Sequence, residues 1–162
     1  MTMDDKERQH WVFRAHVADR AGALTSIASA FSNEGISIDT VVGHGTEERT
    51  LVGGSVVLTF YCTEQEKDIM VRKVKRLSKV TGFEEHPYES QSLRKSAIVS
   101  TTRELKPRDV AGDESFLTCE MVKKKTFWTY FLAGSPSELD QILARLAKEG
   151  IVKDIVYSIV GL

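Results

Sequence analysis

The residues best suited to chemistry lie together at positions 19–24, in the order Asp-Arg-Ala-Gly-Ala-Leu. Gly22 has no Cβ, so the backbone there can bend tightly and a ligand can approach it closely. A helical pattern follows, and the first amides of a helix have no intrahelical acceptor, so they can bind a carboxylate. Asp19 supplies an acidic acceptor that suits an ammonium group. Together these groups match the two charged ends of a free amino acid.

The same residues also have a purely structural explanation. A turn from a strand into a helix needs a glycine and a capping side chain whether or not a ligand binds, and Asp19 can cap the helix itself. Local chemistry therefore leaves both interpretations open, and the rest of the chain must decide between them.

Two elements must hold this segment in place. Before it, residues 11–17 alternate and predict a strand whose apolar face consists of Trp11, Phe13, Ala15 and Val17. After it, apolar residues at helical spacing predict an amphipathic helix whose inner stripe consists of Leu24, Ile27, Ala28 and Phe31. The helix is expected to end at Gly35, a favourable C-terminal residue.

The next elements complete the first half of the chain. Strands are expected over residues 36–42, 52–62 and 80–88, with a possible bulge at Gly53 and Gly54. Thr63 and Glu66 form a capping box that opens a second helix between the last two strands. The order strand-helix-strand-strand-helix-strand predicts an α+β ferredoxin-like unit, with an antiparallel sheet and both helices on one face. Residues 56–61 are apolar on both faces, which suggests a partner surface on the other side of the sheet.

The second half repeats the latter part of this order. Strands are predicted over residues 96–101, 116–122, 127–133 and 151–160, and lysines 123–125 are expected at a hairpin tip. Residues 103–115 are too broken for a confident helix. A second capping box, Ser135 and Glu138 with Pro136 between them, opens a helix whose inner stripe consists of Leu139, Ile142, Leu143 and Leu146. The prediction is an N-terminal tail (1–10), a first domain (11–88), a linker (89–95) and a partly truncated ferredoxin-like domain (96–162).

Composition excludes several classes of function. The net charge is −1 with 28% charged residues, so there is no broad cationic field for nucleic acid. Two cysteines cannot form a secreted disulfide framework, and the N-terminus has no apolar signal core, so we expect a soluble cytoplasmic protein. No zinc spacing or phosphate loop occurs. His16 and His44 are expected in surface or turn positions, and adjacent carboxylates such as Glu84 and Glu85 should point apart, so catalysis by this chain is not expected.

Residues 19–24, with Phe31, Gly35, Ile36 and Ile38 beyond them, resemble the ACT domain, a small amino-acid-sensing module. More narrowly, the chain resembles the small regulatory subunit of acetohydroxyacid synthase (acetolactate synthase), in which an ACT domain precedes a ferredoxin-like domain. Residues 131–140 are similar to the start of that family's C-terminal helix, and residues 155–162 to its last strand. The resemblance covers residues 11–162 and is strongest in 11–43 and 127–162.

The resemblance implies a non-catalytic regulatory subunit that binds a branched-chain amino acid between two ACT domains of a homodimer. The implied effector site consists of Asp19, Arg20, Ala21, Gly22, Ala23, Leu24, Ser37 and Ile38. Asp19 and Ser37 stand where valine-regulated members have asparagine, so valine as the effector stays open. The implied partner is the catalytic subunit, which carries thiamine diphosphate, magnesium and FAD, whereas no cofactor and no metal is expected in this chain.

An alternative function stays open at this stage. Some tandem ACT proteins are free-standing sensors that control transcription through another regulatory protein, without contacting DNA themselves. A third class, a small ferredoxin-like enzyme, needs a convergent set of titratable groups that the sequence does not provide.

Overall fold

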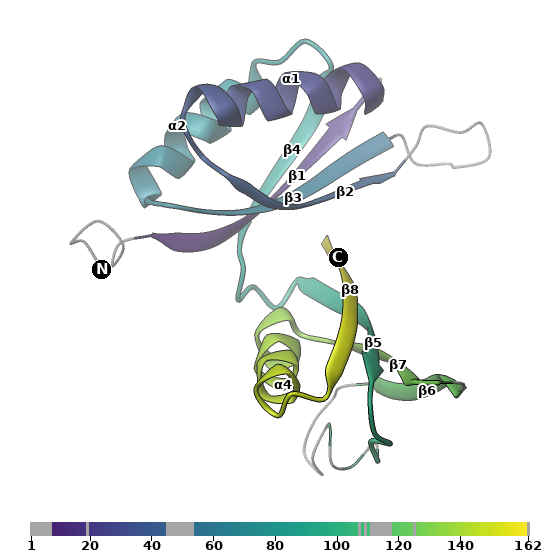
Figure 1. Ribbon diagram of the computed structural model, residues 1–162. Coiled ribbons are helices and arrows are strands. Elements are labelled where there is room, and N and C mark those ends of the chain that lie inside the picture. Colours follow the sequence, from purple (N-terminus) through teal and green to yellow (C-terminus); the bar gives the residue numbers. More distant parts are fainter. Residues whose placement is uncertain are drawn as a thin grey trace. The chain divides into compact units, whose positions relative to one another are not determined.

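The computed structural model describes residues 8–18, 20–44, 54–106, 108, 110, 118–124 and 126–161. The chain divides into two compact units, Met1–Tyr88 and Glu89–Leu162 (Figure 1). A strand, β5, begins at Leu93, within the segment 89–95 that the sequence predicted as a linker.

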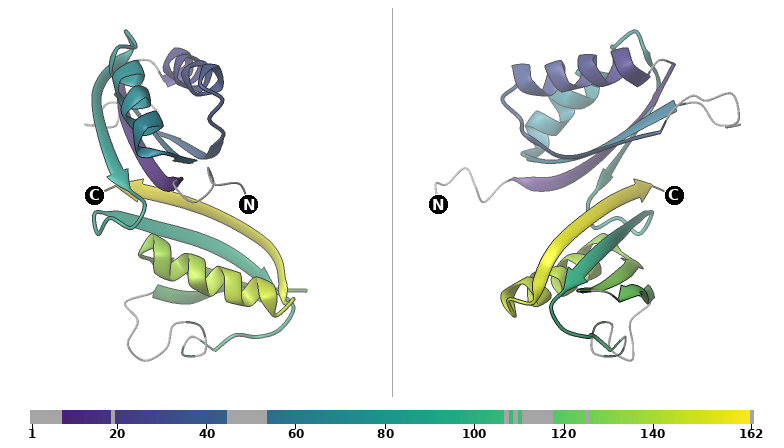
Figure 2. Two further views of the ribbon diagram at one scale, coloured as in Figure 1. Left: turned by 90° about the vertical axis from the view of Figure 1, so that its left-hand side faces the viewer. Right: turned by 45° about the vertical axis from the view of Figure 1, so that its right-hand side comes forward.

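The first unit is an antiparallel sheet with helices on one face. Its elements are β1 (Gln9–Val17), α1 (Arg20–Asn33), β2 (Ile38–His44), β3 (Gly54–Cys62), α2 (Glu64–Lys75) and β4 (Val80–Pro87). The strand order is β2-β3-β1-β4, and every pairing in it is antiparallel. Figure 2 shows α1 and α2 on the same side of this sheet. The predicted ferredoxin-like topology is therefore confirmed.

The second unit has the same strand order around a single fully described helix. Its elements are β5 (Leu93–Thr101), β6 (Thr118–Lys124), β7 (Trp128–Gly134), α4 (Pro136–Lys148) and β8 (Val152–Gly161), and the sheet order is β6-β7-β5-β8. Within the predicted irregular segment, the Val110 amide donates to the Lys106 carbonyl at 3.3 Å, one helical turn apart. Residues 111–117 lie outside the described residues, as does Lys125. Lys123 and Lys124 belong to β6 rather than to the hairpin tip.

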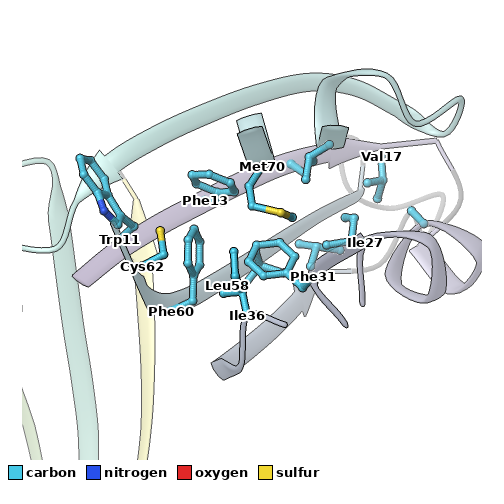
Figure 3. Close-up of a cluster of buried hydrophobic side chains, with 14 residues drawn as sticks. Trp11, Phe13, Val17, Ile27, Phe31, Ile36, Leu58, Phe60, Cys62 and Met70 are labelled. Carbon is cyan, nitrogen blue, oxygen red and sulfur yellow. The ribbon is translucent and has the colours of Figure 1, made fainter. Parts of the chain in front are cut away.

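Aromatic rings fill the core of the first unit (Figure 3). Phe13 and Phe31 both meet Phe60 edge to face, at centroid distances of 4.6 and 4.7 Å. The predicted inner face of β1 is confirmed, because Trp11, Phe13, Ala15 and Val17 are all buried. Edge-to-face contacts of this kind stabilise a core beyond the burial of area alone.

The predicted inner stripe of α1 is half wrong. Ile27 and Phe31 are completely buried, together with Ala23, which the pattern had left out. Leu24 is 37% exposed and Ala28 is exposed. The apolar residues of α1 therefore cover two adjacent faces of the helix, of which only one contacts the sheet.

The helix of the second unit follows its predicted pattern. Leu139, Ile142, Leu143 and Leu146 are all buried against the sheet. The buried Tyr130 hydroxyl accepts a hydrogen bond from the Leu105 amide at 2.7 Å, which fastens the chain after β5 to the same core.

The two predicted capping boxes have different outcomes. At α2 the Thr63 hydroxyl accepts from the Glu66 amide at 3.3 Å, and the Glu66 carboxylate accepts from the Thr63 amide at 2.8 Å, so this box is confirmed. The box predicted at α4 is wrong. The Ser135 hydroxyl caps no backbone amide and instead lies 3.5 Å from Oε2 of Glu138, although Pro136 does occupy the first turn as expected.

Among the described residues, the first sheet has one register shift between β1 and β4, at His16 and Val17, and another on β2. Ile38 and Thr40 pair with consecutive residues of β3, Phe60 and Thr59, so Asp39 is the extra residue of a β-bulge. The sequence had placed a bulge at Gly53 and Gly54. Gly53 lies outside the described residues, and Gly54 pairs in regular register with Val17.

Candidate functional site

The segment predicted to bind an amino acid lies at the start of α1. Because the helix begins at Arg20, Gly22 occupies its first turn rather than the bend before it. Asp19 and the Arg20 side chain lie outside the described residues. In a helix that begins at Arg20, the amides of residues 20–22 are the ones without an intrahelical acceptor, so the free donors precede Ala23.

The Thr25 and Ser26 hydroxyls do not bind these amides. The Thr25 hydroxyl donates to the Ala21 carbonyl at 3.3 Å, and the Ser26 hydroxyl donates to the Gly22 carbonyl at 3.0 Å. Both bonds use acceptors of the first turn rather than its donors. The first turn of α1 contains no acidic residue, so no carboxylate within that turn neutralises the partial positive charge of the helix end.

The side chains of the segment face in different directions. The Ala23 side chain is completely buried in the core, so it cannot contact a ligand. Ala21 is exposed and Gly22 is half-buried, so the first turn of α1 is open to solvent. Leu24 offers an exposed aliphatic side chain next to this turn.

The second predicted half of the site lies in an open groove between α1 and the start of β2. The groove has a volume of about 360 Å³ and is lined by Ala28, Phe31, Ser32, Gly35, Ile36, Ser37 and Ile38. Gly35 has φ +68°, a conformation that glycine adopts without strain, and the chain turns there from α1 toward β2. Ser32 and Ser37 are exposed and Ile38 is half-buried, so the groove presents two hydroxyls and an apolar wall.

A single chain does not bring the two halves together. Both β1 and β2 pair antiparallel with β3, so they run parallel, and β2 begins at the end of the sheet where β1 begins. The first turn of α1 follows the other end of β1. From Gly22 to Phe31 there are nine residues, which at about 1.5 Å per residue separates the halves by ~13 Å along the helix.

The other titratable groups singled out from the sequence form structural ion pairs. His16 Nε2 lies 2.8 Å from Oε1 of Glu84, on the sheet face opposite the helices, and this contact holds the pKa of the Glu84 carboxyl below its usual value. The adjacent Glu85 lies instead 3.5 Å from the buried Lys67, so the two carboxylates do point apart as expected. The side chain of His44 lies outside the described residues.

The cysteines and acidic residues show no reactive arrangement. Burial raises the pKa of the Cys62 thiol to about 12 and also raises that of Cys119, so both thiols are in their unreactive form at neutral pH. Among the described residues, no group of three or more histidine, cysteine or acidic side chains is arranged to hold a metal ion. None of the described helices has both the length and the apolar character needed to cross a bilayer.

Sequence reasoning missed one cluster of side chains. The ring of His10, a residue that no sequence motif singled out, lies between Tyr61 and Tyr88, and its Nε2 is 3.4 Å from Oδ2 of Asp39. The alternation of β1 gave a usable signal, because it places His10 and Val12 on the same face. The contact between His10 and Asp39 depends on the β-bulge at Asp39, which no residue pattern predicted.

The fold defines a class: two consecutive α+β units, each with a four-stranded antiparallel sheet of ferredoxin-like strand order. Among solved structures, the chain is similar to the small subunit of acetolactate synthase from Thermotoga maritima, with a TM-score of 0.66, 12% identity and 96% of each chain covered. The likeness to the ligand-free regulatory subunit of aspartate kinase from Thermus thermophilus is looser, with a TM-score of 0.45, 14% identity, and 87% and 91% of the two chains covered. No family model and no curated protein matches the sequence. The structural likeness therefore establishes the fold over both units.

Proposed function

We propose that this protein is a non-catalytic regulatory subunit that binds a small amino acid between two copies of its first unit. The observation that carries the proposal is the separation of two complementary half-sites. One half is the first turn of α1, whose amides have no intrahelical acceptor, and the other is an open groove with two serine hydroxyls and an apolar wall. A zwitterion with an aliphatic side chain requires both.

A second copy can join the halves through the edge strand β2. If two β2 strands pair antiparallel around a two-fold axis, the start of one strand lies beside the end of the other. Val17, the last residue of β1, pairs with Gly54 of β3, and His44, the last residue of β2, pairs with the next residue, Ser55. The end of β2 therefore lies level with the end of β1, which the first turn of α1 follows. The groove of one copy then meets the helix start of its partner.

Exposed apolar groups line the same edge. Leu24 is 37% exposed, and Val41, which lies on the helix side of β2, is 44% exposed. Leu24, Ala28 and Ser32 recur every four residues and form one face of α1 beside the groove. A second copy seated here would cover this face, which explains why α1 carries more apolar residues than its own core uses.

In the bound state we expect the amides of residues 20–22 to hold the carboxylate of the amino acid. Asp19 and Ser37 would accept from its ammonium group, and Leu24 and Ile38 would contact its side chain. A ligand that bridges two copies can favour one relative orientation of them, and a coupling of about 1–3 kcal/mol is enough to regulate an attached enzyme.

The proposed partner is the catalytic subunit of acetohydroxyacid synthase, which would carry thiamine diphosphate, magnesium and FAD. The likeness over both units to a small subunit of acetolactate synthase supports this choice. Reconstitution with such a subunit, with valine, leucine and isoleucine tested in turn as inhibitors, checks it. Capture of a transcriptional regulator in place of a synthase would favour the free-standing sensor instead.

Calorimetry tests the site directly. We expect Gly22→Asp to abolish amino-acid binding, because the new carboxylate lies where the ligand carboxylate would bind. An acidic residue is favourable in the first turn of a helix, so the variant should still fold. Ser137→Asp adds the same charge to the first turn of α4 and serves as the matched control. Equal binding by the Gly22→Asp and Ser137→Asp proteins would remove the helix start from the site.

A further inference from the structure

A row of three rings crosses the helix-free face of the first sheet where β1 begins. The His10 ring stacks on Tyr61 of β3 at a centroid distance of 4.1 Å and an angle of 14°. Its other side stacks on Tyr88, which follows β4, at 3.7 Å and 17°. The Tyr88 amide also donates to the His10 carbonyl at 3.0 Å. We call these three residues the His10 stack.

A carboxylate lies at the edge of the His10 stack. Oδ2 of Asp39 is 3.4 Å from Nε2 of His10, whose side chain is only 14% exposed. Burial raises the pKa of the Asp39 carboxyl, because the charged form has lost part of its hydration. An imidazolium ion interacts with two aromatic faces and a carboxylate more strongly than a neutral imidazole does. The contact between His10 and Asp39 is therefore stronger when His10 carries a proton.

Asp39 is the bulged residue of β2, and it follows Ser37 and Ile38 directly. In the sheet, β2 is an edge strand whose described pairing is with β3 alone. The contact from His10 on β1 therefore reaches across β3 and fastens the irregular part of the edge strand to the centre of the sheet. Bulges re-aim the side chains beside them, so fixing Asp39 also fixes the neighbouring Ser37 and Ile38.

We propose that the His10 stack is a proton-sensitive clasp on the start of β2, closed when His10 is protonated and loosened when it is neutral. Its effect on ligand binding rests on the proposed function. If Ser37 and Ile38 form part of an amino-acid site, the amino acid binds more tightly on the acid side of the His10 titration. The clasp itself is a property of the sheet and needs no ligand.

The other charged groups on this face are engaged elsewhere. On β4, His86 Nε2 lies 3.6 Å from Oε2 of Glu84. On β1, Val12 separates His10 from Arg14, which lies 3.8 Å from the same carboxylate. Among the described residues, Tyr61, Tyr88 and Asp39 face His10 from other elements, while α1 and α2 cover the opposite face. Titration of His10 therefore changes a contact that β2 itself makes, through Asp39.

Hydrogen–deuterium exchange of the full chain tests the clasp without a ligand. Exchange of the amides of residues 38–44 is followed from about pH 5.5 to about pH 8, a range centred on histidine titration, and corrected for base-catalysed exchange. We expect protection to fall about tenfold in the wild-type protein and to stay constant in His10→Gln. Asp39→Asn, which keeps the size of the side chain, should also remove the pH dependence. His16→Gln, on the same face of β1, is the control and should behave as wild type.

Two outcomes overturn the clasp: no pH dependence in the wild-type protein, or the same dependence in His10→Gln. Calorimetry with valine at both ends of the pH range adds the consequence for the site. We expect about tenfold weaker binding at the alkaline end in the wild-type protein and no difference in His10→Gln. If valine, leucine and isoleucine all fail to bind while the exchange difference persists, the proposed function fails and the clasp stands.

Discussion

The helices α1 and α4 have similar apolar stripes in their sequences, but the two stripes differ in how much of them is buried. Every residue of the predicted stripe of α4 is buried in its own unit, whereas the stripe of α1 divides between the core and an open edge. The second unit thus buries the whole predicted apolar stripe of α4, whereas the first unit leaves part of the stripe of α1 exposed. The uncovered apolar residues of α1 lie at the edge that holds the groove, which is where the proposed second copy would bind.

The largest expected effect tests which face of α1 belongs to the core. Phe31→Ala should lower the free energy of unfolding of the first unit by about 3–5 kcal/mol, since it removes a ring packed between Phe13 and Phe60. Leu143→Ala should lower that of the second unit by about 2–5 kcal/mol. Each unit contains one tryptophan, Trp11 or Trp128, so urea titrations in Trp128→Phe and Trp11→Phe backgrounds report the units separately.

Leu24→Ala is the matched control for Phe31→Ala. Its side chain is partly exposed, so we expect a change of less than about 1 kcal/mol in the free energy of unfolding. A loss as large as that of Phe31→Ala would show that Leu24 belongs to the core and would erase the contrast between α1 and α4.

The next effect concerns the uncovered edge. Leu24→Asp introduces a charge into the surface that we assign to self-association, and we expect the dissociation constant of the dimer to rise about a hundredfold, or ~2.7 kcal/mol. Sedimentation equilibrium measures this constant. Val156→Asp places the same charge on another exposed apolar residue, outside the first unit, and should leave association through the first unit unchanged.

The two helix starts that share a capping-box pattern give a smaller contrast. Thr63→Ala removes an observed reciprocal cap and should lower the free energy of unfolding by about 1 kcal/mol. Ser135→Ala removes a hydroxyl that caps no backbone amide, so we expect a change within about 0.5 kcal/mol. Urea titration with the same tryptophan reporters compares them. Equal losses would mean that Ser135 caps α4 in solution.

The smallest expected effect is the contribution of Glu84 to the pH dependence of the free energy of unfolding. Its carboxyl has a pKa below the ordinary value of 4.5, chiefly because of the hydrogen bond with His16. Such a group stabilises the fold above its unfolded-state pKa, and the contribution disappears as the pH falls through the folded-state pKa. Glu84→Gln should therefore flatten the loss of stability below about pH 5, by less than about 1 kcal/mol because the pair is partly exposed.

Thermal unfolding between about pH 3 and about pH 7 measures this effect. The control is Glu89→Gln, an exposed carboxylate in the turn after β4. If Glu84→Gln and wild type lose stability in parallel on acidification, the ion pairs on this sheet face contribute nothing measurable.

Periodicity alone predicted the order of the elements in both units, because alternation and helical spacing follow directly from which face is buried. It could not predict how a helix divides its apolar residues between a core and an open edge, since Leu24 and Ile27 are chemically alike. It also failed at Ser135 and Asp39. Whether a hydroxyl caps a helix depends on its rotamer, and the position of a bulge depends on the pairing of two strands.

The candidate site was predicted only in part. The sequence marked the first turn of α1 and the start of β2 as the two halves of a candidate site, and the resemblance implies that they meet between two chains. It did not show that residues 20–22, rather than Ala23, hold the free amides, because that depends on where the first helical hydrogen bond forms. Nor did it connect His10 with Asp39, which lie on strands that are not neighbours.

In the proposed dimer, the ~13 Å between the two half-sites of one chain has a consequence for how the affinity for the amino acid must be measured. A pocket completed by a second protomer exists only as often as protomers meet, so the apparent dissociation constant for the amino acid should drift upward as the protein is diluted. By linkage, saturating ligand should in turn hold protomers together at concentrations where the empty protein comes apart. The abundance of this protein in the cell would then help to set the threshold at which it responds.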